Sequence, residues 1–160
     1  MSRAFVNDDT VSQASETVLP DRPVSPHPNL VTETGLKVLE GELQFAKEAL
    51  ALAAKADDAQ ERKRLSAAPV RDIRYFSDRL LTAKLVIPDA TAKAVGFGHS
   101  VSLRYDNGRN VTYRIVGEDE ADPAKGLISY VSPVARNLIG KAVGDEITVG
   151  GHDIEILGIS

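Results

Sequence analysis

The residues with the clearest potential for chemistry lie in one polar stretch, KADDAQERKR, at residues 55–64. The stretch holds three carboxylates, Asp57, Asp58 and Glu61, and carboxylate oxygens are the ligands that hard cations prefer. The D-x-x-E spacing of Asp58 and Glu61 is also that of a helix capping box, in which the Asp accepts a hydrogen bond from a free backbone N–H and the Glu reaches back. The sequence is compatible with both interpretations.

Other reactive groups are sparse along the chain. There is no cysteine, which excludes disulfides, thiolate zinc sites and cysteine nucleophiles. The three histidines, His27, His99 and His152, lie far apart, and neither an H-x-x-x-H metal motif nor a G-x-S-x-G nucleophile motif is present. We therefore expect three surface histidines and no hydrolase chemistry.

Composition limits the classes of function. Of the 160 residues 42% are hydrophobic, which suffices for a folded core, and the formal net charge is −4. Even the most basic segment, residues 33–86, carries ten Lys and Arg against nine Asp and Glu, so we expect no direct nucleic-acid binding, which depends on a basic excess. No stretch approaches the ~18 apolar residues of a membrane span, and a signal-peptide pattern is missing. We expect a cytoplasmic protein with a protein partner and no cofactor of its own.

The first half of the chain divides into an arm and two helices. Residues 1–30 are rich in Ser, Asp and Pro without an apolar period, which indicates a flexible arm. Residues 31–86 show apolar residues at intervals of three and four in two stretches joined by a short polar link, which predicts an antiparallel coiled-coil hairpin within a monomer. The expected seam residues are Leu36, Leu39, Leu43, Ala46, Leu50 and Ala53 in the first helix and Ile73, Phe76, Leu80 and Ala83 in the second.

Pro69 leaves two interpretations of the second helix. Either Ser66 caps a helix with Pro69 in its first turn, or Pro69 interrupts a helix that begins nearer Asp58.

In the second half of the chain, apolar and polar residues alternate, which is a period of two. After a linker at residues 87–94, residues 95–160 contain strands on both sides of Asn107-Gly108, a strong hairpin-turn signal, and again on both sides of the glycines at 150–151. The fold class is therefore α+β, with the helical hairpin followed by a mostly antiparallel sheet.

One short helix is expected between these strand pairs. Ser132-Pro133 has the form of a helix start, with Ser as the cap and Pro at the first helical position, and Gly140 ends the helix. An acidic run precedes it and is either a solvated loop or a partner contact; it comprises Glu118, Asp119, Glu120 and Asp122.

Three sequence blocks carry a resemblance to a known family. YRIVGEDEAD (113–122) and LISYVSPVARNLIGKAVGDEITV (127–149) resemble the FKBP-like carboxy-terminal domain of the bacterial Gre transcription factors, and NLVTETGLKVLEGELQFAK (29–47) resembles the start of their coiled coil. The resemblance implies a factor that docks on the rim of the RNA polymerase secondary channel and inserts its coiled coil. It places the polymerase contact at Ser132, Pro133, Ala135 and Arg136, with Val131 where some members carry an acidic residue.

The expected tip departs from the family pattern. Cleavage-stimulating members carry a GDxxENAEY signature whose carboxylates help to hold a catalytic Mg²⁺ of the polymerase, so the resemblance makes Asp57, Asp58 and Glu61 candidate shared ligands. Here three basic residues, at 62–64, follow and would oppose a nearby cation. The hairpin is also shorter than the family's by about a dozen residues, or ~9 Å of rod.

We therefore expect a regulator of RNA polymerase, not itself an enzyme, that modulates or competes rather than strongly stimulating transcript cleavage. The alternative is a cleavage-competent Gre factor that rescues backtracked complexes. A distant alternative is an FKBP-type peptidyl-prolyl isomerase, although a shared fold does not carry function with it.

Overall fold

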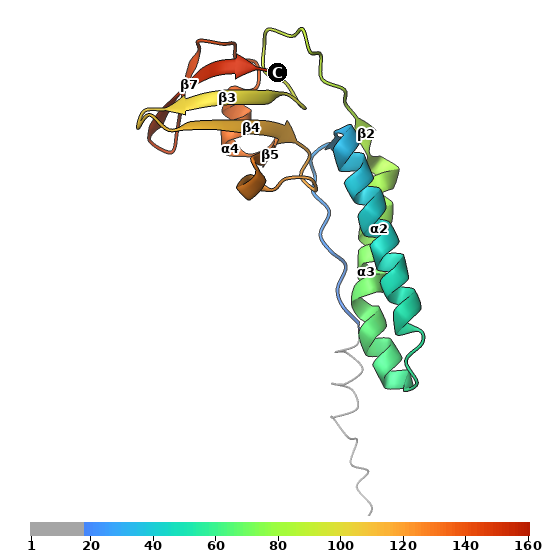
Figure 1. The fold of residues 1–160 in the computed structure, drawn as a ribbon. Coiled ribbons are helices and arrows are strands. Elements are labelled where there is room, and N and C mark those ends of the chain that lie inside the picture. Colours follow the sequence, from blue (N-terminus) through green and yellow to red (C-terminus); the bar gives the residue numbers. More distant parts are fainter. Residues whose placement is uncertain (1–17) are drawn as a thin grey trace, which may run out of the picture. The chain divides into compact units, whose positions relative to one another are not determined.

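The computed structural model describes residues 18–160, which form two compact units. One unit contains residues up to 26 and residues 40–81, and the other contains residues 27–39 and 82–160. The elements confirm the expected α+β fold, with a helical hairpin followed by a sheet that carries one short helix (Figure 1). Among the described residues, no helix has the length and apolar character needed to cross a membrane.

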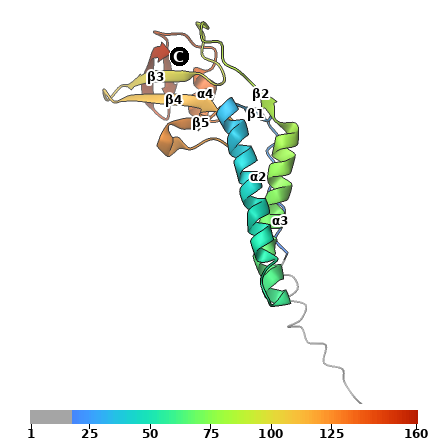
Figure 2. The same cartoon turned by 45° about the vertical axis from the view of Figure 1, so that its right-hand side comes forward.

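The hairpin consists of α2 (Glu33–Ala53) and α3 (Ala59–Thr82), which run antiparallel (Figure 2). The helices have 21 and 24 residues and are therefore about 32 and 36 Å long. Buried side chains recur on α2 every seven residues, as a coiled-coil seam requires. These residues are Leu39, Ala46 and Ala53, with half-buried Leu36, Leu43 and Leu50 between them, so the predicted seam of the first helix is confirmed.

Pro69 lies in the interior of α3, so the helix that begins near Asp58 is the correct one of the two interpretations. Ser66 caps no helix; its hydroxyl donates to the Arg62 carbonyl oxygen at 2.6 Å, one turn earlier. Because proline has no N–H, the carbonyl of residue 65 lacks its helical hydrogen bond.

A proline-rich strap, residues 18–26, contacts α3 within the same unit. Every third side chain of the strap is half-buried, namely those of Leu19, Arg22 and Ser25. Three residues per turn is the repeat of a polyproline II helix. The central contact is Arg22, whose guanidinium lies 3.9 Å from the centroid of the Tyr75 ring and 3.4 Å from the Asp72 carboxylate. The strap is thus fastened to the hairpin by a cation–π contact and an ion pair. The rest of the expected arm, residues 1–17, lies outside the described residues.

The second unit is built on a five-stranded sheet with the order β5-β4-β3-β7-β6. Strand β3 (Ser100–Tyr105) pairs antiparallel with β4 (Asn110–Val116) and with β7 (His152–Ile159), and β7 pairs antiparallel with β6 (Glu146–Val149). The exception is β5 (Leu127–Ser129), which runs parallel to β4 after a crossover that contains the short 3-10 helix η1 (Pro123–Lys125).

The predicted turns and the predicted helix of this unit are confirmed. Gly108 has a φ of +85°, and its N–H donates to the Tyr105 carbonyl at 2.9 Å. The glycines at 150–151 both have positive φ, as a type I′ turn requires. Helix α4 (Pro133–Leu138) contributes two buried residues to the sheet's hydrophobic core. That core comprises Val95, Val101, Leu103, Ile115, Ile128, Ala135, Leu138, Ile147, Ile154 and Ile156.

The segment before α2 belongs to the sheet unit. Strand β1 (Leu30–Val31) pairs parallel with β2 (Lys84–Leu85). Thr32 caps α2, because its hydroxyl accepts from the Gly35 N–H at 2.9 Å and donates to the buried Glu120 carboxylate. A negative charge near a helix N-terminus is favourable. Of the expected acidic loop, Glu120 is therefore neither solvated nor open to a partner, since it binds its own chain.

Candidate docking motif and hairpin tip

The hairpin tip uses Asp58 as the N-cap of α3. The Asp58 carboxylate accepts from the Glu61 N–H at 2.9 Å, and its carbonyl accepts from the Arg62 N–H at 3.0 Å. This is the first half of the capping box that the D-x-x-E spacing predicts. The spacing therefore has an observed structural role at the start of the helix.

Glu61 makes a different contact from the one in a full capping box. Both of its carboxylate oxygens accept from the Arg64 guanidinium, at 2.6 and 3.1 Å, and this hydrogen bond lowers the pKa of Glu61. Arg62 closes the turn by donating to the carbonyl oxygens of Ala56 and Asp57, at 2.6 and 2.9 Å. Two of the three basic residues after the carboxylates thus hold the tip together.

These contacts limit the chemistry of the tip. Asp57 is exposed, Asp58 is engaged in the cap and Glu61 is paired with Arg64. Within residues 18–160, no group of three or more His, Cys, Asp or Glu side chains is arranged to hold a metal ion. A cation held jointly by Asp58 and Glu61 would compete with the cap and with the Arg64 ion pair, which makes this pair a poor metal site of its own.

Replacing Asp58 by alanine is expected to lower the free energy of unfolding by about 1 kcal/mol, the usual value of an N-cap. The matched control is Asp58→Asn, which keeps an acceptor oxygen and should stay within a few tenths of a kcal/mol of the native protein. Calorimetric melting of both variants measures the difference. Equal melting temperatures for the alanine variant and the native protein would show that the cap contributes no stability.

The second candidate site is the docking motif, residues 131–136, which covers the start of α4. Ser132 is the N-cap, and its hydroxyl accepts from the Ala135 N–H at 3.3 Å. Pro133 is the first helical residue and is exposed, while Val131 and Ser132 are half-buried. The predicted helix start is therefore present, with its proline on the surface.

The helix separates the motif into an outer and an inner face. Arg136 is exposed, whereas the side chain of Ala135 is fully buried in the core of the sheet unit. Ala135 was expected at the polymerase contact, but a fully buried side chain cannot make one; it packs the core instead. Only Pro133, Arg136 and the outer parts of Val131 and Ser132 remain available to a partner.

Two apolar residues beside the motif were missed by the sequence interpretation. Ile139 follows α4 directly and Val143 lies in the next turn, and they are 40% and 57% exposed. Both lie in the block LIGKAVGD after the last helical residue, Leu138, where the helical pattern gives no expectation of burial. An exposed apolar residue so close to Pro133 and Arg136 extends the candidate surface.

The histidines differ from the expectation at one position. His99 is only 4% exposed. Its Nδ1 accepts from the Gly96 N–H at 2.9 Å, and its Nε2 lies 2.8 Å from the Asp89 carbonyl oxygen. The prediction of a surface residue is wrong here because the imidazole is buried against two backbone groups of the segment that precedes β3. His27 and His152 are exposed as expected.

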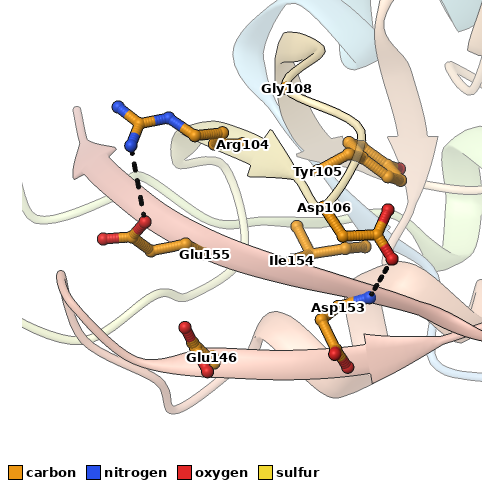
Figure 3. Close-up of a pocket in the computed structure, with 8 residues that line it drawn as sticks. All are labelled: Arg104, Tyr105, Asp106, Gly108, Glu146, Asp153, Ile154 and Glu155. Carbon is orange, nitrogen blue, oxygen red and sulfur yellow. Dashed lines mark hydrogen bonds and ion pairs between the residues drawn. The ribbon is translucent and has the colours of Figure 1, made fainter.

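A hollow of about 300 Å³ is lined by the end of β3, the start of β6 and the first half of β7 (Figure 3). Three of its four carboxylates are engaged with neighbours: Asp106 with His152 at 3.2 Å, Glu155 with Arg104 at 3.7 Å and Asp153 with the Thr148 hydroxyl at 2.7 Å. The bond from His152 lowers the pKa of Asp106. The lining residues are Arg104, Tyr105, Asp106, Gly108, Glu146, Asp153, Ile154 and Glu155. This charged surface does not resemble the aromatic pocket that a prolyl isomerase needs.

The aromatic residues of the sheet unit pack against its core. Phe97 and Tyr130 contact each other edge to face, with ring centroids 5.7 Å apart. Tyr105 and Tyr113 lie against the same core. Because these rings serve packing, the isomerase alternative gains no support from them.

Comparison with known proteins identifies the class as transcription elongation factors. Residues 90–160 match the family model described as "Transcription elongation factor, GreA/GreB, C-term". The chain is 38% identical over 138 residues to the transcription elongation factor GreA of Helicobacter pylori, covering 82% of this chain and 78% of that protein. It is 39% identical over 110 residues to GreA of Desulfovibrio desulfuricans, covering 65% and 66%. The chain therefore belongs to the GreA/GreB family.

Two solved structures are also similar to this chain. GreA factor homolog 1 (Gfh1) of Thermus thermophilus is 22% identical with a TM-score of 0.40, over 82% of this chain and 97% of that one. A GreA/GreB factor from Nitrosomonas europaea is 20% identical with a TM-score of 0.40, over 82% and 98%.

Proposed function

We propose that this elongation factor binds RNA polymerase at the rim of the secondary channel through its docking motif and inserts its helical hairpin, modulating transcription or competing with other Gre factors. Membership of the family and the exposed Pro133 and Arg136 support the docking half of the proposal. The hairpin of α2 and α3 supplies the inserted element.

One observation carries the view that the factor does not strongly stimulate cleavage: two of the three tip carboxylates, those with the D-x-x-E spacing, are already engaged. Asp58 caps α3 and Glu61 is held by Arg64. Lys63 beside them is exposed and adds positive charge, which opposes binding of a cation. Carboxylates in such contacts are poor partners for a shared Mg²⁺, whose ligands must lie ~2 Å away.

The length of the hairpin supports the same conclusion. Relative to the family's coiled coil it lacks about six residues per arm, which corresponds to ~9 Å at 1.5 Å per residue. A shortfall of that size would keep the tip out of ligand distance from a metal that a full-length hairpin reaches. The protein would then occupy the channel without contributing ligands.

In a transcript-cleavage assay on backtracked complexes, the protein is expected to leave the cleavage rate at the intrinsic rate of the polymerase. It is also expected to reduce the cleavage that a stimulating Gre factor produces, because both need the same channel. The control for the second effect is Arg136→Glu, which should compete less. Acceleration of cleavage that is abolished by Asp58→Ala would instead establish the cleavage-competent alternative.

A further inference from the structure

The residue before the docking motif, Tyr130, makes contacts that reach far across the sequence. Its hydroxyl donates to the Pro28 carbonyl oxygen at 2.6 Å. Its ring packs edge to face on Phe97, with the planes at 77°. Its backbone N–H donates to the Val116 carbonyl at 2.9 Å. Tyr130 is therefore held by three separate segments of the sheet unit.

The carbonyl that accepts the hydroxyl is itself firmly held. The residue after it, Asn29, is buried, and its carbonyl oxygen accepts from the Lys84 N–H at 2.8 Å. Val31 is also buried and accepts from the Val86 N–H at 2.9 Å. The segment that follows Pro28 is thus held at Asn29 and at Val31, so the Pro28 carbonyl oxygen is an acceptor with a fixed position.

The docking motif also has restraints of its own: the Arg136 N–H donates to the Ser132 carbonyl at 2.9 Å, and the Asn137 side-chain amide donates to the Pro133 carbonyl at 2.7 Å. The Ser132 N–H donates to the Ser129 carbonyl at 2.9 Å, and the Val131 N–H donates to the Ser129 hydroxyl at a longer 3.3 Å. The cap bond from Ser132 to Ala135 is equally long at 3.3 Å. On the side before α4, the motif is held by the two bonds to Ser129 and by Tyr130, whose contacts with Pro28 and Phe97 restrain the chain directly before Val131.

We propose that Tyr130 is a positioning residue for the docking motif: through Pro28 and Phe97 it holds Val131, Ser132 and Pro133 in the conformation that binds the polymerase. The inference rests on the proposed docking function. Its physical basis is that a loop ordered before binding does not lose conformational entropy on association. Tyr130 acts through its neighbours, because its hydroxyl and ring are both directed at its own chain.

The test is Tyr130→Phe, which keeps the ring on Phe97 and removes the hydroxyl that donates to Pro28. A single hydrogen bond contributes about 0.5–1.5 kcal/mol net, so affinity for core RNA polymerase should fall about 2- to 10-fold. Hydrogen exchange should become faster at the amides of Val131, Ser132 and Ala135 and stay unchanged in β3 and β7. The matched control is Tyr113→Phe, whose hydroxyl interacts with Tyr105 and should leave both measurements unchanged.

A double-mutant cycle with Pro133→Ala separates positioning from direct contact. If Tyr130 acts through the motif, its effect on affinity should shrink once Pro133 is replaced. Unchanged affinity of Tyr130→Phe, or weaker binding without faster exchange in the motif, would overturn the inference while leaving the docking function intact. Failure of the native protein to bind polymerase would instead refute the docking function.

Discussion

Replacing Gly117 by alanine is expected to lower the melting temperature by about 5–12 °C, because overpacking and loss of a buried charged hydrogen bond together cost about 2–4 kcal/mol. A Cβ at this position would lie 2.3 Å from the Leu30 carbonyl oxygen and 3.8 Å from the Val31 Cα. Both are backbone atoms, so no side chain can rotate away. The segment of β1 must move, and Thr32 would move with it, away from Glu120.

The matched control for this prediction is Gly41→Ala in α2. A Cβ there would meet nothing within 4 Å. A glycine in a helix interior lowers the stability of the protein by about 0.5–1 kcal/mol relative to alanine. The same chemical change should therefore stabilise the hairpin and destabilise the sheet unit. Calorimetry of both variants gives the comparison. A Gly117→Ala protein that melts at or above the native temperature would show that β1 is not packed against residue 117.

The double variant Pro133→Ala/Arg136→Glu is expected to bind core RNA polymerase roughly 10- to 100-fold more weakly, the range of an interface hot spot. Both side chains are exposed, and neither belongs to the core of the sheet unit. The Ser132 cap is left in place so that α4 keeps its start. The loss should therefore appear in affinity, measured by biolayer interferometry, with little change in melting temperature.

Two controls sharpen the docking test. Arg109→Glu makes the same charge reversal at an exposed residue of the turn between β3 and β4 and should bind normally. Raising the salt concentration should reduce the contribution of Arg136, since exposed charges are screened. Native affinity for the double variant would place the polymerase contact elsewhere on the protein and leave the role of the motif as a helix cap alone.

Much of the fold could be predicted because its signals are local. The seam on α2, the turns at Gly108 and at 150–151, and the Ser132 cap all depend on residues within a few positions of each other. The helix start at Asp58 was equally local, yet the same D-x-x-E spacing serves a cap or a cation. The structure decided for the cap by directing the Asp58 carboxylate to a backbone N–H.

The features that the sequence did not predict share a different cause. The parallel pairing of β5, the burial of His99 and the burial of Ala135 all depend on which distant segment covers a residue. For Ala135 a signal existed, since Leu138 is three positions later and shares its helix face. The contact between Thr32 and Glu120 had none, because those residues are 88 positions apart.

The sequence by itself therefore determined the helical hairpin, the strand pairs around the two turns, the short helix at Ser132-Pro133 and the family, since periodicity, caps and turn residues act over short distances. Tertiary structure alone decided which chemistry-bearing residues are free. It left Pro133 and Arg136 exposed and buried Ala135 and Glu120. It also brought the Tyr130 hydroxyl into a hydrogen bond with the carbonyl oxygen of Pro28, 102 positions earlier in the sequence. Burial depends on neighbours that only the folded chain brings together, and a local pattern does not contain them.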